Sequence, residues 1–222
     1  MTKAAHKDLV AQILDLPQAP VLVEELRRVL EQEQEKRREF YASLFVEEQK
    51  AEFINGEIVI QSPVKKHHNE YSGLLYQFLN VYAARHDLGF VGVEKIMISL
   101  TRNDYEPDLC YFRKELAGQF TENQSFFPAP DLIVEIVSSK TESRDRGIKF
   151  DDYQNHGIEE YWMILPDQKV VEQYHLHNGV YELILKSSNG EIESFAVKGF
   201  KIPIQAIFDK AVNLNVLAKL LA

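Results

Sequence analysis

The chain has 222 residues, 45% of them hydrophobic and 11% aromatic, which is enough to build the core of one ordinary domain. Its net charge of −9 repels polyanions at long range and disfavours a general nucleic-acid binder, although a metal-dependent enzyme with a local basic patch stays possible. The single cysteine, Cys110, excludes an intramolecular disulfide and a cysteine-rich zinc site. Since no apolar run reaches the roughly 20 residues of a membrane span and no leader pattern stands at the N-terminus, we expect a cytoplasmic protein.

The N-terminal region carries a helical pattern from residue 19 to about 44. Apolar residues recur at spacings of three and four up to Leu30, and the polar run EQEQEKRRE (31–39) follows. A polar middle of this length indicates a helix that either faces solvent or packs on a partner chain. We therefore expect a helical extension over residues 1–45 and a main domain over residues 46–222.

The main domain alternates strand-like and helix-like segments. Asn55-Gly56 between two apolar-alternating arms predicts a hairpin within residues 51–63, and helical periodicity predicts helices over residues 66–85 and 143–155. The predicted strands are 89–100, 104–112, 131–137, 159–166, 169–177 and 179–185, with a short strand in 196–209 before a last helix over 213–222. This order favours an α/β (α+β) domain with a mixed β-sheet flanked by helices.

One predicted strand contains a charge that a buried strand should exclude. In PDLIVEIVSS (130–139), Glu135 stands among residues that read as buried on both faces, where an unpaired carboxylate costs several kcal/mol or more by rough estimate. Asp108 similarly opens the apolar segment LCYF after Pro107. If the two strands are neighbours, the two carboxylates lie close together and repel each other unless a cation lies between them. Hard divalent ions such as Mg²⁺ take carboxylate oxygens as ligands.

The next predicted helix carries a lysine that could reach these two carboxylates. Lys149, Tyr153 and His156 fall on one stripe at spacings of four and three. Lys149 could stabilise charge that develops on a phosphate during cleavage. A structural alternative is open at this point, because Glu135 could instead form a buried ion pair with Arg144 or Lys149.

Together these residues resemble the Uma family of restriction endonucleases, within the PD-(D/E)XK nuclease superfamily. The resemblance is carried by Pro107-Asp108, then Glu135-Ile136-Val137-Ser138, then Lys149 and Tyr153, then GIEEYW at 157–162, with EFINGE at 52–57 and Ser62-Pro63 upstream. It covers roughly residues 45–205, and the order in which the pieces occur makes it specific.

The resemblance implies a restriction-endonuclease-like core and cleavage of DNA phosphodiester bonds with Mg²⁺ or Mn²⁺. Asp108 and Glu135 would be the metal ligands. The superfamily lysine usually lies two residues after the glutamate, where this chain has Val137, and Lys149 is its expected replacement. His67 and Glu70, at the start of the helix over 66–85, are further candidates for catalytic roles.

A second function remains open at the level of sequence. The fold could persist as a non-catalytic module that acts in binding or assembly through its N-terminal helix. For a nuclease we expect a homodimer, by analogy, because two symmetry-related sites cut two strands most simply.

Overall fold

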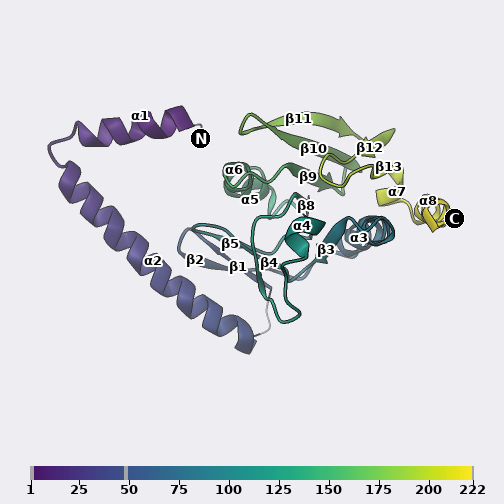
Figure 1. The fold of residues 1–222 in the computed structure, drawn as a ribbon, viewed down its shortest axis with the longest axis horizontal. Coiled ribbons are helices and arrows are strands. Elements are labelled where there is room, and N and C mark those ends of the chain that lie inside the picture. The colour runs from purple at the N-terminus through teal and green to yellow at the C-terminus, as the bar shows by residue number, and fades with distance from the viewer. Residues whose placement is uncertain (1–2, 48–49, 222) are drawn as a thin grey trace. The chain divides into compact units, whose positions relative to one another are not determined.

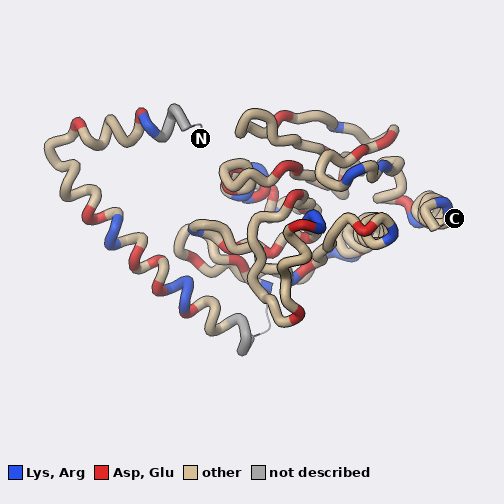
Figure 2. Tube along the Cα trace, in the orientation of Figure 1, with Lys and Arg blue, Asp and Glu red and all other residues tan. Residues whose placement is uncertain are grey.

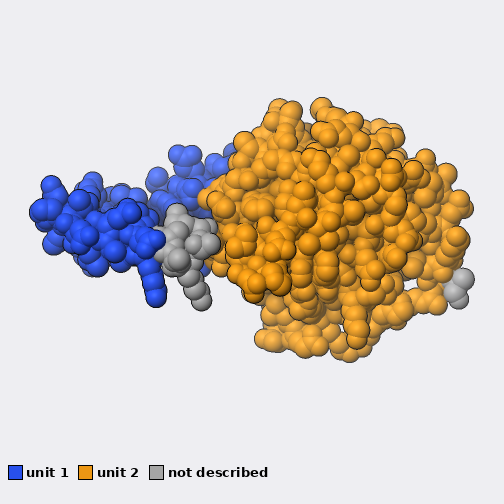
Figure 3. Space-filling view, turned by 90° about the horizontal axis from the view of Figure 1, so that it is seen from above, with its two compact units in different colours: residues 1–62, 99–105 blue, residues 63–98, 106–222 orange. Residues whose placement is uncertain are grey.

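The computed structural model describes residues 3–47 and 50–221. The chain divides into two compact units, one of residues 1–62 and 99–105, the other of residues 63–98 and 106–222 (Figure 3). Residues 99–105 therefore belong to the smaller unit, although they lie between two segments of the larger unit in the sequence. Each unit is built from its own pattern of apolar residues.

The smaller unit joins two helices to a small antiparallel sheet (Figure 1). Helices α1 (Lys3–Leu14) and α2 (Ala19–Glu47) precede β1 (Ala51–Ile54) and β2 (Glu57–Ile60), and β5 (Asp104–Tyr105) pairs with the other edge of β1. Asn55 and Gly56 have φ values of 51° and 83°, which confirms the predicted hairpin turn. Phe40 of α2 stacks on Phe53 of β1 at 5.7 Å between ring centroids.

The larger unit is organised around a six-stranded mixed sheet, which confirms the predicted fold class. Its order is β11-β10-β9-β8-β6-β3, with β8 and β9 parallel and the other neighbours antiparallel. The strands are β3 (Gly89–Val93), β6 (Leu109–Arg113), β8 (Leu132–Ile136), β9 (Glu160–Leu165), β10 (Val170–His177) and β11 (Val180–Ser187).

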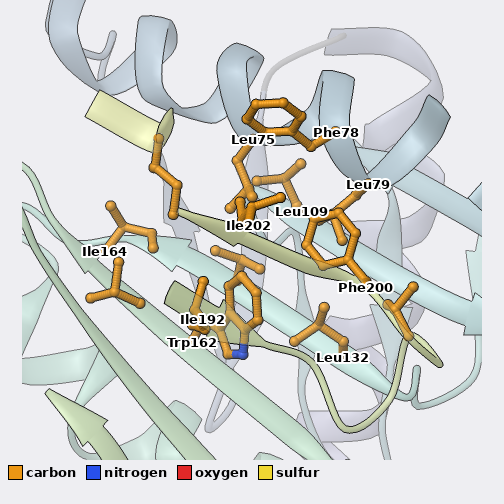
Figure 4. Packing of buried hydrophobic residues seen from close by; sticks show 14 of the residues in the cluster. Leu75, Phe78, Leu79, Leu109, Leu132, Trp162, Ile164, Ile192, Phe200 and Ile202 are labelled. Carbon is orange, nitrogen blue, oxygen red and sulfur yellow. The ribbon is translucent and has the colours of Figure 1, made fainter. Parts of the chain in front are cut away.

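One face of this sheet carries the main hydrophobic core. Side chains alternate along a strand, so Leu132, Val134 and Ile136 of β8 share a face. They belong to the same buried cluster as Leu75 and Phe78 of helix α3 (Lys66–Arg85) (Figure 4). Further residues of this cluster come from β12 (Glu191–Glu193), β13 (Lys201–Pro203) and α7 (Gln205–Phe208), and α8 (Lys210–Leu221) packs against it.

The other face of β8 carries Glu135. The helical segment beside it is α5 (Glu142–Asp145) and α6 (Ile148–Asn155), and Tyr153 of α6 makes an edge-to-face contact with Tyr161 of β9 at 5.3 Å. Glu135 and Tyr161 share this face because Ile133 pairs with Tyr161 and lies two residues before Glu135. The alternation of β8 therefore puts its carboxylate against the helix that carries Lys149.

Several predicted boundaries were wrong. The helix expected over 143–155 is broken into α5 and α6 at Gly147. The strand expected over 89–100 is divided into β3 and β4 (Met97–Ser99), since Glu94 and Lys95 adopt left-handed φ values of 45° and 34°. The short elements β12, α4 (Lys114–Ala117) and β7 (Phe126–Phe127) were not predicted, whereas α1 lies within the helical extension expected over residues 1–45. Within the described ranges, no helix combines the length and apolar character that crossing a membrane requires.

Candidate active site

The two predicted carboxylates meet on neighbouring strands. Leu109 of β6 pairs with Val134 of β8 in antiparallel register, so Asp108 and Glu135 occupy the next opposed position. Opposed residues of an antiparallel pair project from the same face of a sheet. The expectation that these strands are neighbours is confirmed, and both carboxylates are buried.

Asp108 is held at both oxygens. Its Oδ2 accepts a hydrogen bond of 2.7 Å from the backbone N–H of Ile136, and its Oδ1 lies 3.1 Å from Nε2 of His68. The backbone bond ties Asp108 to β8 just beyond Glu135. The histidine fixes the other oxygen from the first turn of α3, so the orientation of this carboxylate is set by two elements.

Glu135 is the centre of a buried polar cluster. Its Oε1 accepts hydrogen bonds from Nζ of Lys149 at 2.9 Å and from the hydroxyl of Tyr153 at 3.0 Å. The Lys149 ammonium also lies 3.8 Å from Oδ1 of Asp145. A buried charge is tolerable only when it is paired and hydrogen-bonded, and here Lys149 supplies the opposite charge. The ion pair that the sequence left open is therefore formed with Lys149.

The break between α5 and α6 positions the lysine. Lys149 and Tyr153 lie one helical turn apart and reach the same Glu135 oxygen. Gly147, which precedes α6, has φ −111° and ψ −105°, and a Cβ at this position would lie 2.7 Å from the carbonyl oxygen of Ser143. Only glycine fits this turn without a shift of the backbone.

The electrostatic surroundings are dominated by burial and by these acids. Burial raises the pKa of the Tyr161 hydroxyl well above its ordinary value, and the nearby negative charges of Glu135 and Asp145 raise it further. Burial likewise raises the pKa of the Cys110 thiol. Neither group is poised to ionise near neutral pH, so Cys110 is an inert thiol.

The start of α3 differs in detail from the expectation. The rings of His67 and Tyr71 lie tilted to each other, at 6.1 Å between ring centroids, and Glu70 pairs with Lys66 at 3.5 Å. The histidine that contacts Asp108 is His68, not His67. Helical spacing does not separate the two, because His67 and His68 each lie seven residues before a buried leucine, Leu74 and Leu75.

The donor set fits a magnesium-type ion that retains water. Mg²⁺ is commonly bound by one or two protein carboxylates, with water and substrate phosphate completing its octahedron. Asp108 and Glu135 supply two carboxylates on one face of the sheet. Among the residues that the structure describes, no group of three or more histidine, cysteine, aspartate and glutamate side chains is placed to hold a metal ion. A closed structural zinc site needs four protein ligands, so the pair Asp108 and Glu135 does not resemble one.

Comparison with known proteins gives a family and a similar fold. The family model of Uma2, described as "Putative restriction endonuclease", matches residues 37–205. A crystal structure at 1.96 Å of "a putative nuclease belonging to DUF820" from Anabaena variabilis ATCC 29413 matches with a TM-score of 0.64 and 18% identity, over 75% of this chain and 92% of that one. At this identity the likeness shows the fold. No curated protein matches. Because the family model covers well over half of the sequence, this chain belongs to the Uma2 family.

Proposed function

We propose that this protein is a Mg²⁺- or Mn²⁺-dependent DNA endonuclease with a site of the PD-(D/E)XK type. Membership of the Uma2 family and the nuclease-like fold support a nuclease function. The observation that carries the finer proposal is the opposed position of Asp108 and Glu135, with Lys149 in contact with the second carboxylate. Buried acids gathered with a lysine at one position are typical of functional sites.

Each residue then has a distinct role. Asp108 and Glu135 hold the metal ion, which when bound lowers the pKa of a coordinated water and polarises the scissile phosphate. Lys149 stabilises negative charge that develops on the phosphate. His68 and Tyr153 hold the two carboxylates in place through the contacts at 3.1 Å and 3.0 Å.

The displaced lysine is consistent with this assignment. Val137, two residues after Glu135, is buried and cannot supply a charge. Lys149 comes from α6 instead, and its Nζ reaches the carboxylate directly. In this assignment Lys149 of the adjacent helix takes the role of the lysine that the superfamily usually carries on the strand, at the position of Val137.

A non-catalytic module is the second candidate, and one observation favours it. Lys149 already pairs with Glu135, so the charge of this carboxylate is balanced without any metal ion. Such a module would keep these residues for stability alone and would be indifferent to divalent ions.

Cleavage of supercoiled and linear DNA with Mg²⁺ or Mn²⁺ distinguishes the two. The isosteric variants Asp108→Asn and Glu135→Gln remove ligand charge, and Asp151→Asn, on the exposed surface of α6, is the matched control. A nuclease loses cleavage and calorimetric Mn²⁺ binding in both site variants and keeps both in the control. Metal binding and cleavage that are absent in the wild type, or that survive in the site variants, would overturn the proposal.

A further inference from the structure

The contact between Lys149 and Glu135 conflicts with the roles proposed for these two residues. Oε1 of Glu135 accepts hydrogen bonds from Nζ of Lys149 at 2.9 Å and from the Tyr153 hydroxyl at 3.0 Å. A metal ion on the same carboxylate would repel the lysine ammonium, because both are cations. The lysine therefore needs a second negative partner when Glu135 binds the ion, a requirement that rests on the proposed function.

Asp145 lies where such a partner is needed. It is buried, and its Oδ1 lies 3.8 Å from Nζ of Lys149, which is too long for a hydrogen bond but short enough for an ion pair. Since the contact with Glu135 measures 2.9 Å, a shift of the ammonium by about 1 Å would give Asp145 a contact of the same length. Lysine can make this shift because its charge lies at the end of a flexible four-carbon stem.

The backbone around Asp145 is held by two strands. Its carbonyl oxygen accepts a hydrogen bond of 3.2 Å from the hydroxyl of Tyr161 on β9. The next residue, Arg146, donates a hydrogen bond of 2.7 Å to the buried Glu172 of β10. Acidic and basic residues both occur along this segment of α5 and α6 (Figure 2). The acid is therefore fixed, and the lysine is the group that can move.

The charges on this face of the sheet also require a shared lysine. Burial raises the pKa of the Tyr161 hydroxyl. The negative charges of Glu135, Asp145 and Asp108 raise this pKa further, so all three acids lie near the tyrosine. Lys149 is within ion-pair distance of two of them and cannot balance both at once. A cation held by Asp108 and Glu135 would leave the lysine to Asp145.

We propose that Asp145 is the second acceptor of the Lys149 ammonium, a positioning residue that holds the lysine while Glu135 serves as a metal ligand. In the metal-free protein the ammonium lies on Glu135 and compensates a buried charge. Held by Asp145 instead, it stays beside the site and is no longer bound to the carboxylate that holds the ion. Asp145 is not assigned as a ligand, since no three potential ligands among the described residues are placed to hold one ion.

Neighbouring acids fit this role less well. Asp108 is the other expected metal ligand, and its oxygens already contact the backbone of β8 and His68. Glu142, at the start of α5, is exposed and pairs with Arg146 at 2.9 Å. Of these acids, only Asp145 is buried, in contact with the lysine and not assigned to the ion.

A double-variant cycle in metal-free buffer tests the exchange. Glu135→Gln and Asp145→Asn each leave Lys149 one acid, so each alone should lower the melting temperature by only a few degrees. Together they leave a buried lysine without either acid, which should lower the melting temperature by about 10 °C beyond the sum of the single losses. Additive losses would overturn the inference.

The matched control for this cycle is Glu172→Gln. Glu172 is buried and holds the same segment through Arg146, but it does not contact Lys149. Its loss in melting temperature should add to that of Glu135→Gln. If this pair were as non-additive as Glu135→Gln with Asp145→Asn, the coupling would reflect a loosened segment and the inference would be wrong.

Calorimetric Mn²⁺ titration tests the link to the metal site. Asp145→Asn should weaken Mn²⁺ binding about tenfold, as is typical of residues behind a ligand, because the displaced lysine has no second acceptor. Asp145→Glu keeps the charge and should restore the affinity, and Glu172→Gln should leave it unchanged. In a Lys149→Met background the loss from Asp145→Asn should shrink, since no lysine is displaced. An equal loss there, or none in the wild-type background, would refute the role of Asp145.

The two measurements separate this inference from the proposed function. A wild type that binds no Mn²⁺ would overturn the proposed function, whereas the metal-free cycle would still decide whether Lys149 exchanges between the two acids. A wild type that binds Mn²⁺ together with an additive cycle would leave the nuclease proposal intact and remove Asp145 from it.

Discussion

Lys149 and Glu135 form an ion pair whose effect on stability depends on both partners. Removal of Lys149 leaves Glu135 buried and unpaired, which typically costs about 3–5 kcal/mol. We expect Lys149→Met to lower the free energy of unfolding by about that amount in urea denaturation. The double variant Lys149→Met with Glu135→Gln should recover much of the loss, because no full charge of the pair remains.

The matched control for the comparison of Lys149→Met with its double variant is Lys114→Met. Lys114 pairs with Asp87 at the surface, where ion pairs contribute about 0–1 kcal/mol. If Lys149→Met were as mild as this control, or if the double variant were no more stable than Lys149→Met alone, the ion pair would not be the compensation for the Glu135 charge.

Glu172 of β10 gives a prediction for acid stability. Burial alone would raise the pKa of this carboxyl, but hydrogen bonds from Arg146, Lys186 and Tyr174 lower it to about 2, from an ordinary 4.5. Since folding favours the charged form, its contribution is complete above about pH 4.5 and is lost as the pH falls towards 2. Thermal unfolding of Glu172→Gln from pH 2 to 7 should therefore show a flatter dependence in this window.

The same substitution should reduce stability near neutral pH by about 1–3 kcal/mol, because charge-assisted hydrogen bonds from Arg146 and Lys186 are lost. Glu182→Gln, on the exposed strand β11, is the control. Equal slopes for Glu172→Gln and the wild type below pH 4.5 would contradict the assignment.

At the scale of elements, the α5–α6 break is expected to control the position of Lys149. In Gly147→Ala the new Cβ would lie 2.7 Å from the Ser143 carbonyl, so the backbone must shift. We expect a loss of about 1–3 kcal/mol in the free energy of unfolding, together with reduced DNA cleavage if Lys149 acts as proposed. Gly73→Ala is the control, since a Cβ there meets nothing within 4 Å and alanine favours the α3 helix.

Elements with a clear period were predictable from the sequence, and short or interrupted ones were not. Apolar spacing predicts helix α3 and the strands of the main sheet, and Asn55-Gly56 predicts the hairpin of β1 and β2. Three-residue strands such as β12 are too short to show a period, and the break at Gly147 depends on a backbone conformation that apolar spacing does not encode.

The geometry of the candidate site was predictable where a motif fixed it. Asp108, Glu135 and Lys149 were named from the sequence, and the structure places Lys149 on Glu135 and aligns the two acids. His68 was missed in favour of its neighbour, because helical spacing fits both histidines. His67 lies seven residues before the buried Leu74 and His68 seven before the buried Leu75, so only the contact with Asp108 separates them.

At the scale of the whole molecule, the proposed nuclease combines a net charge of −9 with a polyanionic substrate. This charge repels DNA, so productive binding by such an enzyme would depend on local contacts. The homodimer expected for a nuclease would hold a second site at high effective concentration, which would favour cutting of the second strand before the DNA dissociates.

The homodimer expected for a nuclease predicts that cutting of the second strand depends on protein concentration. We expect linear DNA to appear early from supercoiled plasmid at concentrations where sedimentation equilibrium shows a dimer, and nicked circles to dominate where it shows a monomer, because a monomer holds one site. A ratio of nicked to linear DNA that does not change with protein concentration would separate double-strand cleavage from dimer formation.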